Sequence, residues 1–141
     1  MMKRLSVILI AIVALILPLT VSAKRQSAES GTPAITFKEK THDFGTIKEA
    51  DGVVEYKFAY TNTGTAPLVI VTVSATCGCT VPDFDTKPLA PGKSGEVTIR
   101  FAPKGQRGEF DKRITVRTNV RGQAGKPMLR IKGVIIPASN D

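Results

Sequence analysis

The sequence has little of the chemistry on which enzymes most often rely. Its 141 residues contain no tryptophan, one histidine and two cysteines. The single histidine, His42, needs a companion placed by the fold before it can act as a general base or a metal ligand, and we expect it on the surface of a strand. No serine lies in a nucleophile-elbow motif, and no glycine-rich phosphate-binding loop is present. These absences predict a protein that is not an enzyme and that holds no cofactor.

Aromatic residues make up only 6% of the chain, whose formal net charge is +8. The basic residues are scattered among strand and loop positions instead of lining one helix. This distribution is typical of a moderately basic, solvated surface and not of a nucleic-acid interface. We therefore expect no nucleic-acid partner.

The first 23 residues have the three parts of a secretory signal peptide. Lys3 and Arg4 are positively charged, residues 5–17 are almost wholly apolar, and Ala23 is a small residue at the expected cut. As a helix, the apolar run up to its break at Pro18 spans roughly 22 Å, whereas a bilayer core needs about 30 Å. We therefore expect cleavage after Ala23, a periplasmic or secreted protein and no membrane span afterwards; an uncleaved anchor is the alternative.

Composition changes again after the expected cut. Residues 24–34 are rich in Ser, Ala, Glu, Gly and Pro and show no apolar periodicity, which predicts a flexible linker. The folded domain is expected over residues 35–137, followed by a short tail at 138–141.

Strands and turns fill the expected domain, and no amphipathic helical pattern of useful length occurs in it. Val97, Ile99 and Phe101 alternate with polar residues, which is the period of a half-buried strand. Residues 68–73 form a continuous apolar run, which indicates a strand covered on both sides or one bordering a bend. We expect seven short strands, at 35–37, 42–47, 53–61, 68–73, 96–101, 110–118 and 129–135. Seven strands in about one hundred residues predict an all-β, two-sheet sandwich.

Two glycine-containing segments indicate local backbone features. Asn62-Thr63-Gly64 is typical of a turn between strands. Gly45, directly after Phe44, predicts a bulge or a close backbone crossing within a strand.

Several short motifs follow one another along the chain, namely Asp43-Phe44-Gly45-Thr46-Ile47, Asn62-Thr63-Gly64 with Pro67-Leu68, Cys77-Gly78-Cys79-Thr80-Val81-Pro82, Pro91-Gly92 and Ile131-Lys132-Gly133-Val134. In this order and spacing they resemble the domain of unknown function 1573 family. The resemblance implies an exported bacterial domain with an immunoglobulin-like fold, akin to hydin-type and major-sperm-protein-type modules, and no settled activity. Unlike antibody domains, the chain lacks tryptophan, and its two cysteines are too close in sequence to bridge two sheets. Its core must rest on packing alone.

Cys77 and Cys79 are the candidate site, because they are the only thiols and flank a glycine that adopts conformations other residues resist. Export favours a disulfide between them. By the loop-closure estimate, a disulfide that closes so short a ring adds only about 1.5 kcal/mol to the stability of the fold. Stability alone is therefore a poor reason for this disulfide. A structural turn or local bridge, a thiol-redox pair and a soft-metal site for an ion such as Cu(I), completed by a partner, are the open interpretations.

Two functions follow from these observations. The first is an exported non-catalytic module that contacts another envelope protein through its sheet edges or end loops, or has a structural role there. The alternative is a periplasmic thiol-redox or soft-metal-binding protein that uses the Cys-Gly-Cys pair. The sequence does not indicate an oligomeric state.

Overall fold

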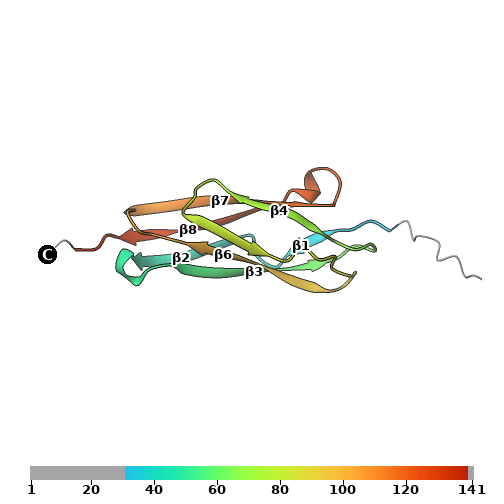
Figure 1. The fold of residues 1–141 in the computed structure, drawn as a ribbon, viewed down its shortest axis with the longest axis horizontal. Helices are drawn as coiled ribbons and strands as arrows, with labels where there is room; N and C mark the ends of the chain where they lie inside the picture. The colour runs from blue at the N-terminus through green and yellow to red at the C-terminus, as the bar shows by residue number, and fades with distance from the viewer. Residues whose placement is uncertain (1–30, 140–141) are drawn as a thin grey trace, which may run out of the picture.

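A computed structural model describes residues 31–139 as eight strands in two sheets (Figure 1). The predicted signal peptide, linker residues 24–30 and the last two tail residues lie outside the described range. The strands are β1 (Ile35–Phe37), β2 (Thr41–Lys48), β3 (Val54–Asn62), β4 (Ile70–Ala75), β5 (Thr80–Phe84), β6 (Ser94–Phe101), β7 (Gly108–Thr118) and β8 (Met128–Ile136). Two short 3-10 turns, η2 (Glu49–Asp51) and η3 (Gln123–Gly125), lie between strands. None of the helices in this range is long and apolar enough to cross a membrane.

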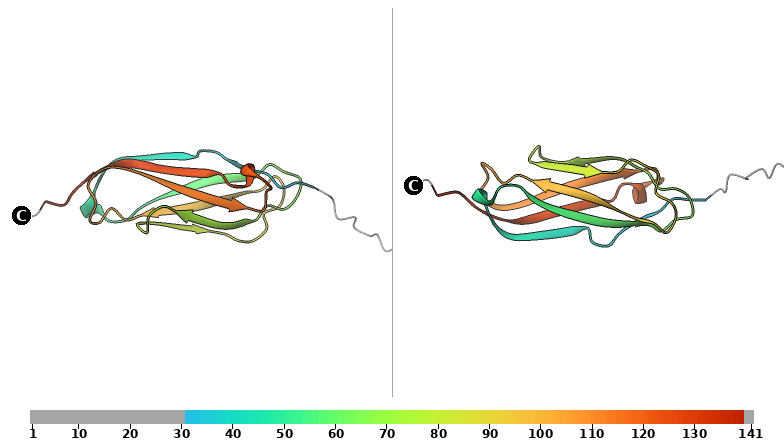
Figure 2. Two further views of the ribbon diagram at one scale, coloured as in Figure 1. Left: turned by 90° about the horizontal axis from the view of Figure 1, so that it is seen from above. Right: turned by 60° about the horizontal axis from the view of Figure 1, so that its bottom comes forward.

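The two four-stranded sheets pack face to face as a sandwich, which confirms the predicted fold class (Figure 2). One sheet has the strand order β1-β3-β6-β5 and the other β2-β8-β7-β4. All neighbours are antiparallel except β2 and β8, which run parallel. The chain crosses from one sheet to the other five times, after β1, β2, β3, β4 and β6. The edge strands are β1 and β5 in one sheet and β2 and β4 in the other.

The structure has one strand more than the seven predicted. The additional strand is β5, which was not predicted from the sequence. It is five residues long and contains Pro82, and a proline argues against a central strand. β5 forms because it lies at the edge of its sheet and pairs with β6, from Thr80 opposite Phe101 to Phe84 opposite Val97. An edge strand needs hydrogen bonds on one side only, so a proline is tolerated there.

The core lies between the sheets and is formed by the inward-facing residues that the alternation predicted. Val97, Ile99 and Phe101 of β6 are fully buried. The Phe101 ring stacks on Phe110 of β7, with ring centroids 4.4 Å apart. The buried side chains from both sheets belong to a single cluster, so the core rests on packing between sheets as expected.

The apolar run at residues 68–73 is a strand bordering a bend, not one covered on both sides. The strand β4 begins only at Ile70, and its register with β7 shifts between Ile70 and Thr72. Val71 in this irregularity is 61% exposed. Leu68 instead forms an isolated bridge with Leu89.

The bulge predicted at Gly45 is confirmed. The register between β2 and β8 shifts between Asp43 and Thr46, and Gly45 has a φ of 63°. A Cβ at Gly133 would stand 2.7 Å from the Gly45 carbonyl oxygen, which is too close for any other residue. The backbone of the bulge in β2 therefore lies close to β8 at a position, Gly133, where β8 also has a glycine.

Asn62, read from the sequence as part of a turn, is a fully buried polar residue that joins two loops. Its Nδ2 donates hydrogen bonds to the carbonyl oxygens of Ala66 and Leu89, at 2.8 and 2.9 Å. Its Oδ1 accepts one from the Gly64 N–H at 3.0 Å. Both polar groups of the amide are therefore satisfied in the interior.

The two ends of the described chain lie at opposite ends of the sandwich (Figure 1). At one end, Thr32 and Thr65 exchange hydrogen bonds, and the Thr63 N–H donates to the Ala34 carbonyl oxygen. The last residues of the predicted linker are thus attached to the β3–β4 loop. At the other end, Ala138 of the predicted tail donates its N–H to a Glu49 carboxylate oxygen at 3.0 Å.

Candidate functional site

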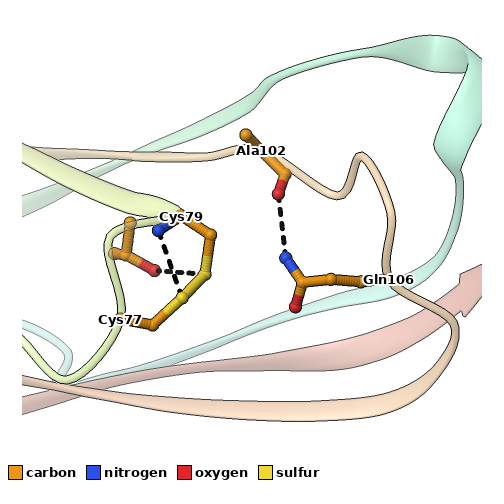
Figure 3. Close-up of a disulfide and its surroundings, with 5 residues drawn as sticks. Cys77, Cys79, Ala102 and Gln106 are labelled. Atoms are coloured by element: carbon orange, nitrogen blue, oxygen red, sulfur yellow. Dashed lines mark hydrogen bonds between the residues drawn. A yellow bond between two sulfur atoms is a disulfide. The ribbon is translucent and has the colours of Figure 1, made fainter.

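Cys77 and Cys79 lie in the tight connection that carries the chain from β4 in one sheet to β5 in the other (Figure 3). Their Sγ atoms are joined as a disulfide, and their Cα atoms are 5.3 Å apart. This separation falls within the range of about 4.4 to 6.8 Å typical of disulfides. The backbone therefore accommodates the bridge. Its closure in the exported protein stays a prediction.

Backbone hydrogen bonds hold the Cys77–Cys79 loop in place. The Cys79 N–H donates to the Cys77 Sγ at 3.1 Å, and the Thr80 N–H donates to the Cys77 carbonyl oxygen at 3.1 Å. The Cys79 carbonyl oxygen accepts a hydrogen bond from the Ala102 N–H at 2.9 Å. The Gln106 side chain in turn donates to the Ala102 carbonyl oxygen at 3.0 Å (Figure 3). The β6–β7 loop is thus hydrogen-bonded to the turn that contains the disulfide.

The bridge is open to the solvent on its Gly78 side. Both cysteines are half-buried, and Gly78 is exposed. A Cβ at Gly78 would meet no atom within 4 Å. Cys79 packs against the core, whereas the turn leads away from it. The turn that carries the bridge is therefore in contact with solvent at Gly78.

Metal-binding side chains do not gather around the cysteines. Within residues 31–139, no group of three or more His, Cys, Asp or Glu side chains is placed to hold a metal ion. A sulfur engaged in a disulfide is also not a thiolate ligand. The soft-metal interpretation would therefore need both reduction of the bridge and further ligands from a partner.

His42 was expected on the surface of a strand; it lies on the strand β2 but is half-buried between the sheets. Its ring stacks on Tyr56 of the opposite sheet, with centroids 3.6 Å apart, and meets Phe44 edge-on at 4.6 Å. The Tyr56 hydroxyl donates to a Glu39 carboxylate oxygen at 2.9 Å. Burial lowers the pKa of His42, and the nearby carboxylates of Glu39 and Asp43 partly offset this effect.

The structure does not bring His42 and the cysteines together. β2, which carries His42, is at one edge of its sheet, and β4, which leads to Cys77, is at the other. Tyr56 lies on the inward face of β3, but its pairing with His42 depends on how two sheets stack. No local signal in the sequence could have revealed it.

An apolar hollow of about 410 Å³ lies at the same end of the sandwich as the disulfide. Its lining comes from η2 and the residues after it, the β6–β7 loop and the start of the tail, and consists of Glu49, Ala50, Gly52, Val53, Ala102, Pro103, Lys104 and Ala138. Val53 at its rim is 61% exposed. The sequence alone does not reveal this hollow, because its walls come from segments as far apart as Glu49 and Ala138.

Glu49 connects two of these segments through hydrogen bonds to its carboxylate. Its carboxylate accepts hydrogen bonds from the Gly105 N–H at 2.8 Å and the Ala138 N–H at 3.0 Å. Both bonds favour the charged form and lower the pKa of Glu49. The carboxylate thus connects the β6–β7 loop to the tail.

A second hollow, of about 580 Å³, lies on the outer face of the sheet that contains β2, β8 and β7. Its carboxylates are largely paired with basic residues. Lys132 lies 3.5 Å from Asp43, and Arg130 forms a bidentate pair with Asp111, which lowers the pKa of Asp111. This hollow is therefore a surface of exposed ion pairs.

Comparison with solved structures shows the same fold in proteins of low sequence identity. A Porphyromonas gingivalis protein of unknown function matches with a TM-score of 0.62 and 20% identity, over 73% of this chain and 47% of its own. The chain thus spans about half the length of that protein. The seventh PapD-like domain of human CEP192 matches with a TM-score of 0.61 and 15% identity, over 77% of this chain and 89% of its own.

A third match is part of a protease. The VesB protease of Vibrio cholerae has a TM-score of 0.59 and 16% identity, over 72% of this chain and 32% of its own. At these identities, all three likenesses show the fold alone. No curated protein gives a significant match to the chain.

The sequence itself matches a family model over residues 35–135, which is well over half of the chain and spans every strand from β1 to all but the last residue of β8. The described motifs lie inside this range, including the Cys77–Cys79 turn. The chain therefore belongs to the family described as "Protein of unknown function (DUF1573)".

Proposed function

We propose that the protein is an exported, non-catalytic β-sandwich module that binds another protein of the cell envelope through the loops at the disulfide end. The family and the Porphyromonas neighbour carry no assigned activity, which is consistent with a module of this kind. Its export rests on the signal-like residues 1–23. A kinship with hydin-type and major-sperm-protein-type modules is part of the proposal, and the PapD-like domain of CEP192 supports it.

Sheet edges are a less suitable binding surface, because each edge strand carries a feature that hinders strand addition. The hydrogen bond from the Ala102 N–H to the Cys79 carbonyl oxygen sets the pattern of β5. In this pattern Val81 and Asp83 face β6 with their backbone groups, and the backbone of Pro82 faces the open edge. Because Pro82 has no N–H, β5 offers a poor template for another strand.

The other edges are interrupted or short. β4 is irregular at Val71, and β2 is bulged at Gly45. β1 is only three residues long. Bulges and short edge strands both discourage pairing with a further chain. The end loops are therefore the better candidates for a partner.

The exposed apolar rim at Val53 is the observation that carries the proposal. Val53 lies beside a hollow whose lining is mostly Ala, Gly, Pro and Val side chains. Glu49 and Lys104 give this apolar lining a charged border. Apolar centres with polar borders are typical of protein-binding patches. An apolar side chain on a loop of the partner would fit this hollow.

A photo-crosslinking amino acid at position 53 tests the proposal in intact cells. We expect a discrete crosslinked adduct with one envelope protein. The same crosslinker at position 71 is a matched control, because Val71 has the same exposed fraction as Val53 but lies on the β4 edge. No adduct at position 53, or the same adduct from both positions, would overturn the assignment to the end loops.

Thiol–disulfide exchange at Cys77 and Cys79 is a second candidate function. The observation that favours it is that both cysteines are only half-buried and flank an exposed glycine in a turn. Incubation of the purified protein with reduced and oxidised glutathione, followed by thiol titration, tests it. Exchange predicts a ratio of closed to open pairs that follows the glutathione ratio, whereas a pair that stays closed throughout would leave the bridge with a structural role only.

A further inference from the structure

The register of β4 with β7, continued past the end of β4, points to a lysine opposite Cys77. In the β4–β7 pair, Ala75 lies opposite Ile114. The Thr76 N–H donates to the Arg113 carbonyl oxygen at 3.2 Å, so the same register continues one residue further. Continued by one more residue into the turn, this register would set Cys77 opposite Lys112.

The side chains of Cys77 and Lys112 start on the same face of the sheet. Lys112 lies between buried Phe110 and Ile114, and it is half-buried, whereas its neighbours Asp111 and Arg113 are exposed on the outer face. Beyond the end of β4 the alternation of burial continues, since Cys77 is half-buried like Ala75, whereas Ser74 and Thr76 are exposed. Because Thr76 and Arg113 are hydrogen-bonded, a Cys77–Lys112 pair in this register would be of the other antiparallel type, in which side chains are closest. In a pair of that type the Cβ atoms are roughly 5 Å apart.

Negative charge on the Cys77 sulfur would be stabilised from two sides. The Cys79 N–H already points at this sulfur at 3.1 Å. Lys112 supplies a positive charge, and it forms no ion pair with a carboxylate of residues 31–139. The Cys79 sulfur has a weaker environment, with the Thr80 hydroxyl at 3.9 Å and the apolar core beside it. The two sulfurs are therefore not equivalent.

We propose that Lys112 stabilises Cys77 as the thiolate when the bridge opens, and so makes Cys77 the leaving sulfur of the disulfide and the reactive sulfur of the dithiol. This inference rests on the second candidate function, thiol–disulfide exchange. The substrate class is a dithiol of another exported protein. Lys112 acts through Cys77 and is a positioning residue, not a catalytic one.

The exchange is balanced in electrons and protons. A substrate thiolate attacks the Cys79 sulfur, a mixed disulfide forms, and Cys77 leaves as a thiolate beside Lys112. The second substrate thiolate then attacks the substrate sulfur of the mixed disulfide and releases Cys79 as a thiolate. The substrate dithiol loses two electrons and becomes a disulfide, the Cys77–Cys79 pair gains them, and the two protons released by the substrate thiols end on the two cysteines or in water. A lower thiol pKa makes the better leaving group.

The pH dependence of thiol alkylation measures this directly. In the Cys79→Ser variant, the rate of Cys77 alkylation by iodoacetamide should reach half its maximum well below the ordinary thiol pKa of about 8.5. In the Cys77→Ser variant, Cys79 should titrate at a higher pH than Cys77. Adding Lys112→Gln should move the Cys77 profile to higher pH, and Lys112→Arg should retain the low value.

Arg113→Gln is the matched control. It removes one positive charge from the adjacent residue, but on the outer face. A shift of equal size for Arg113→Gln and Lys112→Gln would overturn the proposal, as would a Cys77 profile that does not respond to Lys112. Circular dichroism of each variant shows whether it is folded.

The exchange equilibrium of the intact pair with glutathione separates this inference from the function on which it rests. We expect Lys112→Gln to shift that equilibrium about tenfold toward the disulfide, because the reduced form loses its stabilised thiolate. A pair that never exchanges, with a Cys77 titration that still depends on Lys112, would overturn the exchange function and support the Lys112 assignment. A pair that exchanges equally well with and without Lys112 would overturn the Lys112 assignment alone.

Discussion

Phe101 is fully buried at the centre of the sandwich, where its ring stacks on Phe110. Replacement of a buried phenylalanine by alanine removes apolar contacts and leaves a cavity, which costs about 3 to 5 kcal/mol. We expect Phe101→Ala to lower the free energy of unfolding by this amount, a large part of the stability of a small domain. Urea denaturation followed by circular dichroism measures it, and an unchanged midpoint would contradict the burial of this ring.

Arg100 is the control for Phe101, because it is the preceding residue and points to the outer face. Its guanidinium lies 2.9 Å from Glu55 and 3.8 Å from Asp83, and all three side chains are partly exposed. Exposed ion pairs contribute about 1 kcal/mol or less. Arg100→Ala should therefore cost far less than Phe101→Ala.

The lowered pKa of His42 predicts that the stability of the folded protein depends on pH. Burial lowers its pKa in the folded protein below the unfolded value of 6.5, so the unfolded chain binds a proton more readily. Stability from this residue is fully present above pH 6.5, falls as the pH drops from 6.5 toward the folded pKa, and does not fall further below that. The melting temperature should therefore be lower at pH 5.5 than at pH 7.5. The variant His42→Phe, which keeps an aromatic ring on Tyr56, should reduce this difference.

The carboxylates affect a separate pH range. The pKa values of Asp43, Glu49 and Asp111 are lowered by hydrogen bonds, so their contribution is present at neutral pH and is lost only as the pH falls through their folded values, which lie below those of ordinary carboxylates. A melting temperature that rises between pH 7.5 and 5.5, or an equal change in His42→Phe, would contradict the role of His42.

At the level of whole strands, β5 provides a test of how the sheet edges are protected. Pro82 leaves the open edge of β5 without an N–H at that position, and Val81 beside it is exposed. Pro82→Val should restore a donor in a strand-forming residue and so favour pairing of β5 with a second copy of the chain. We expect a higher average mass than that of the parent in light scattering at equal concentration.

Pro88→Val is the control for Pro82→Val, since Pro88 is exposed in the β5–β6 connection and outside any strand. An equal increase in mass for both variants would indicate a general effect of losing proline. No increase for Pro82→Val would show that another feature protects this edge.

For the whole molecule, the disulfide should matter little to folding. It closes a loop of about three residues, which contributes at most about 1.5 kcal/mol. One kcal/mol corresponds to about 4 to 8 °C in a domain of this size. The Cys77→Ser, Cys79→Ser double variant should keep its β-type circular dichroism and lose roughly 10 °C or less in melting temperature. Global unfolding of the double variant would make the bridge a structural requirement.

Export of the whole chain is tested by its mass. If residues 1–23 are a cleaved signal peptide, protein recovered from the envelope should have the intact mass of a chain that begins at Lys24. A mass that includes Met1 to Ala23 would instead indicate a retained membrane anchor.

The sequence by itself determined the class of the fold and most of its strands. The alternation in β3, β6, β7 and β8 identifies which side chains face the core, because successive residues in a strand point to opposite faces whatever the partner strand. Phe101 and Gly45 were predicted correctly for the same reason: burial on an alternating strand and a glycine bulge are properties of a few neighbouring residues.

Tertiary structure alone decided the features that depend on residues far apart in the chain. β5 forms only because β6 pairs with it, so its own sequence, with Pro82, did not reveal it. The stacking of His42 on Tyr56 requires two sheets in contact, and the hollow beside Val53 requires segments that Glu49 joins across 89 residues. Even at Cys77 and Cys79, the sequence named the two thiols, but only the pairing of β4 with β7 points to Lys112 as a neighbour of one of them. Local patterns determine which face a side chain takes, whereas its neighbours across strands and sheets exist only once the chain has folded.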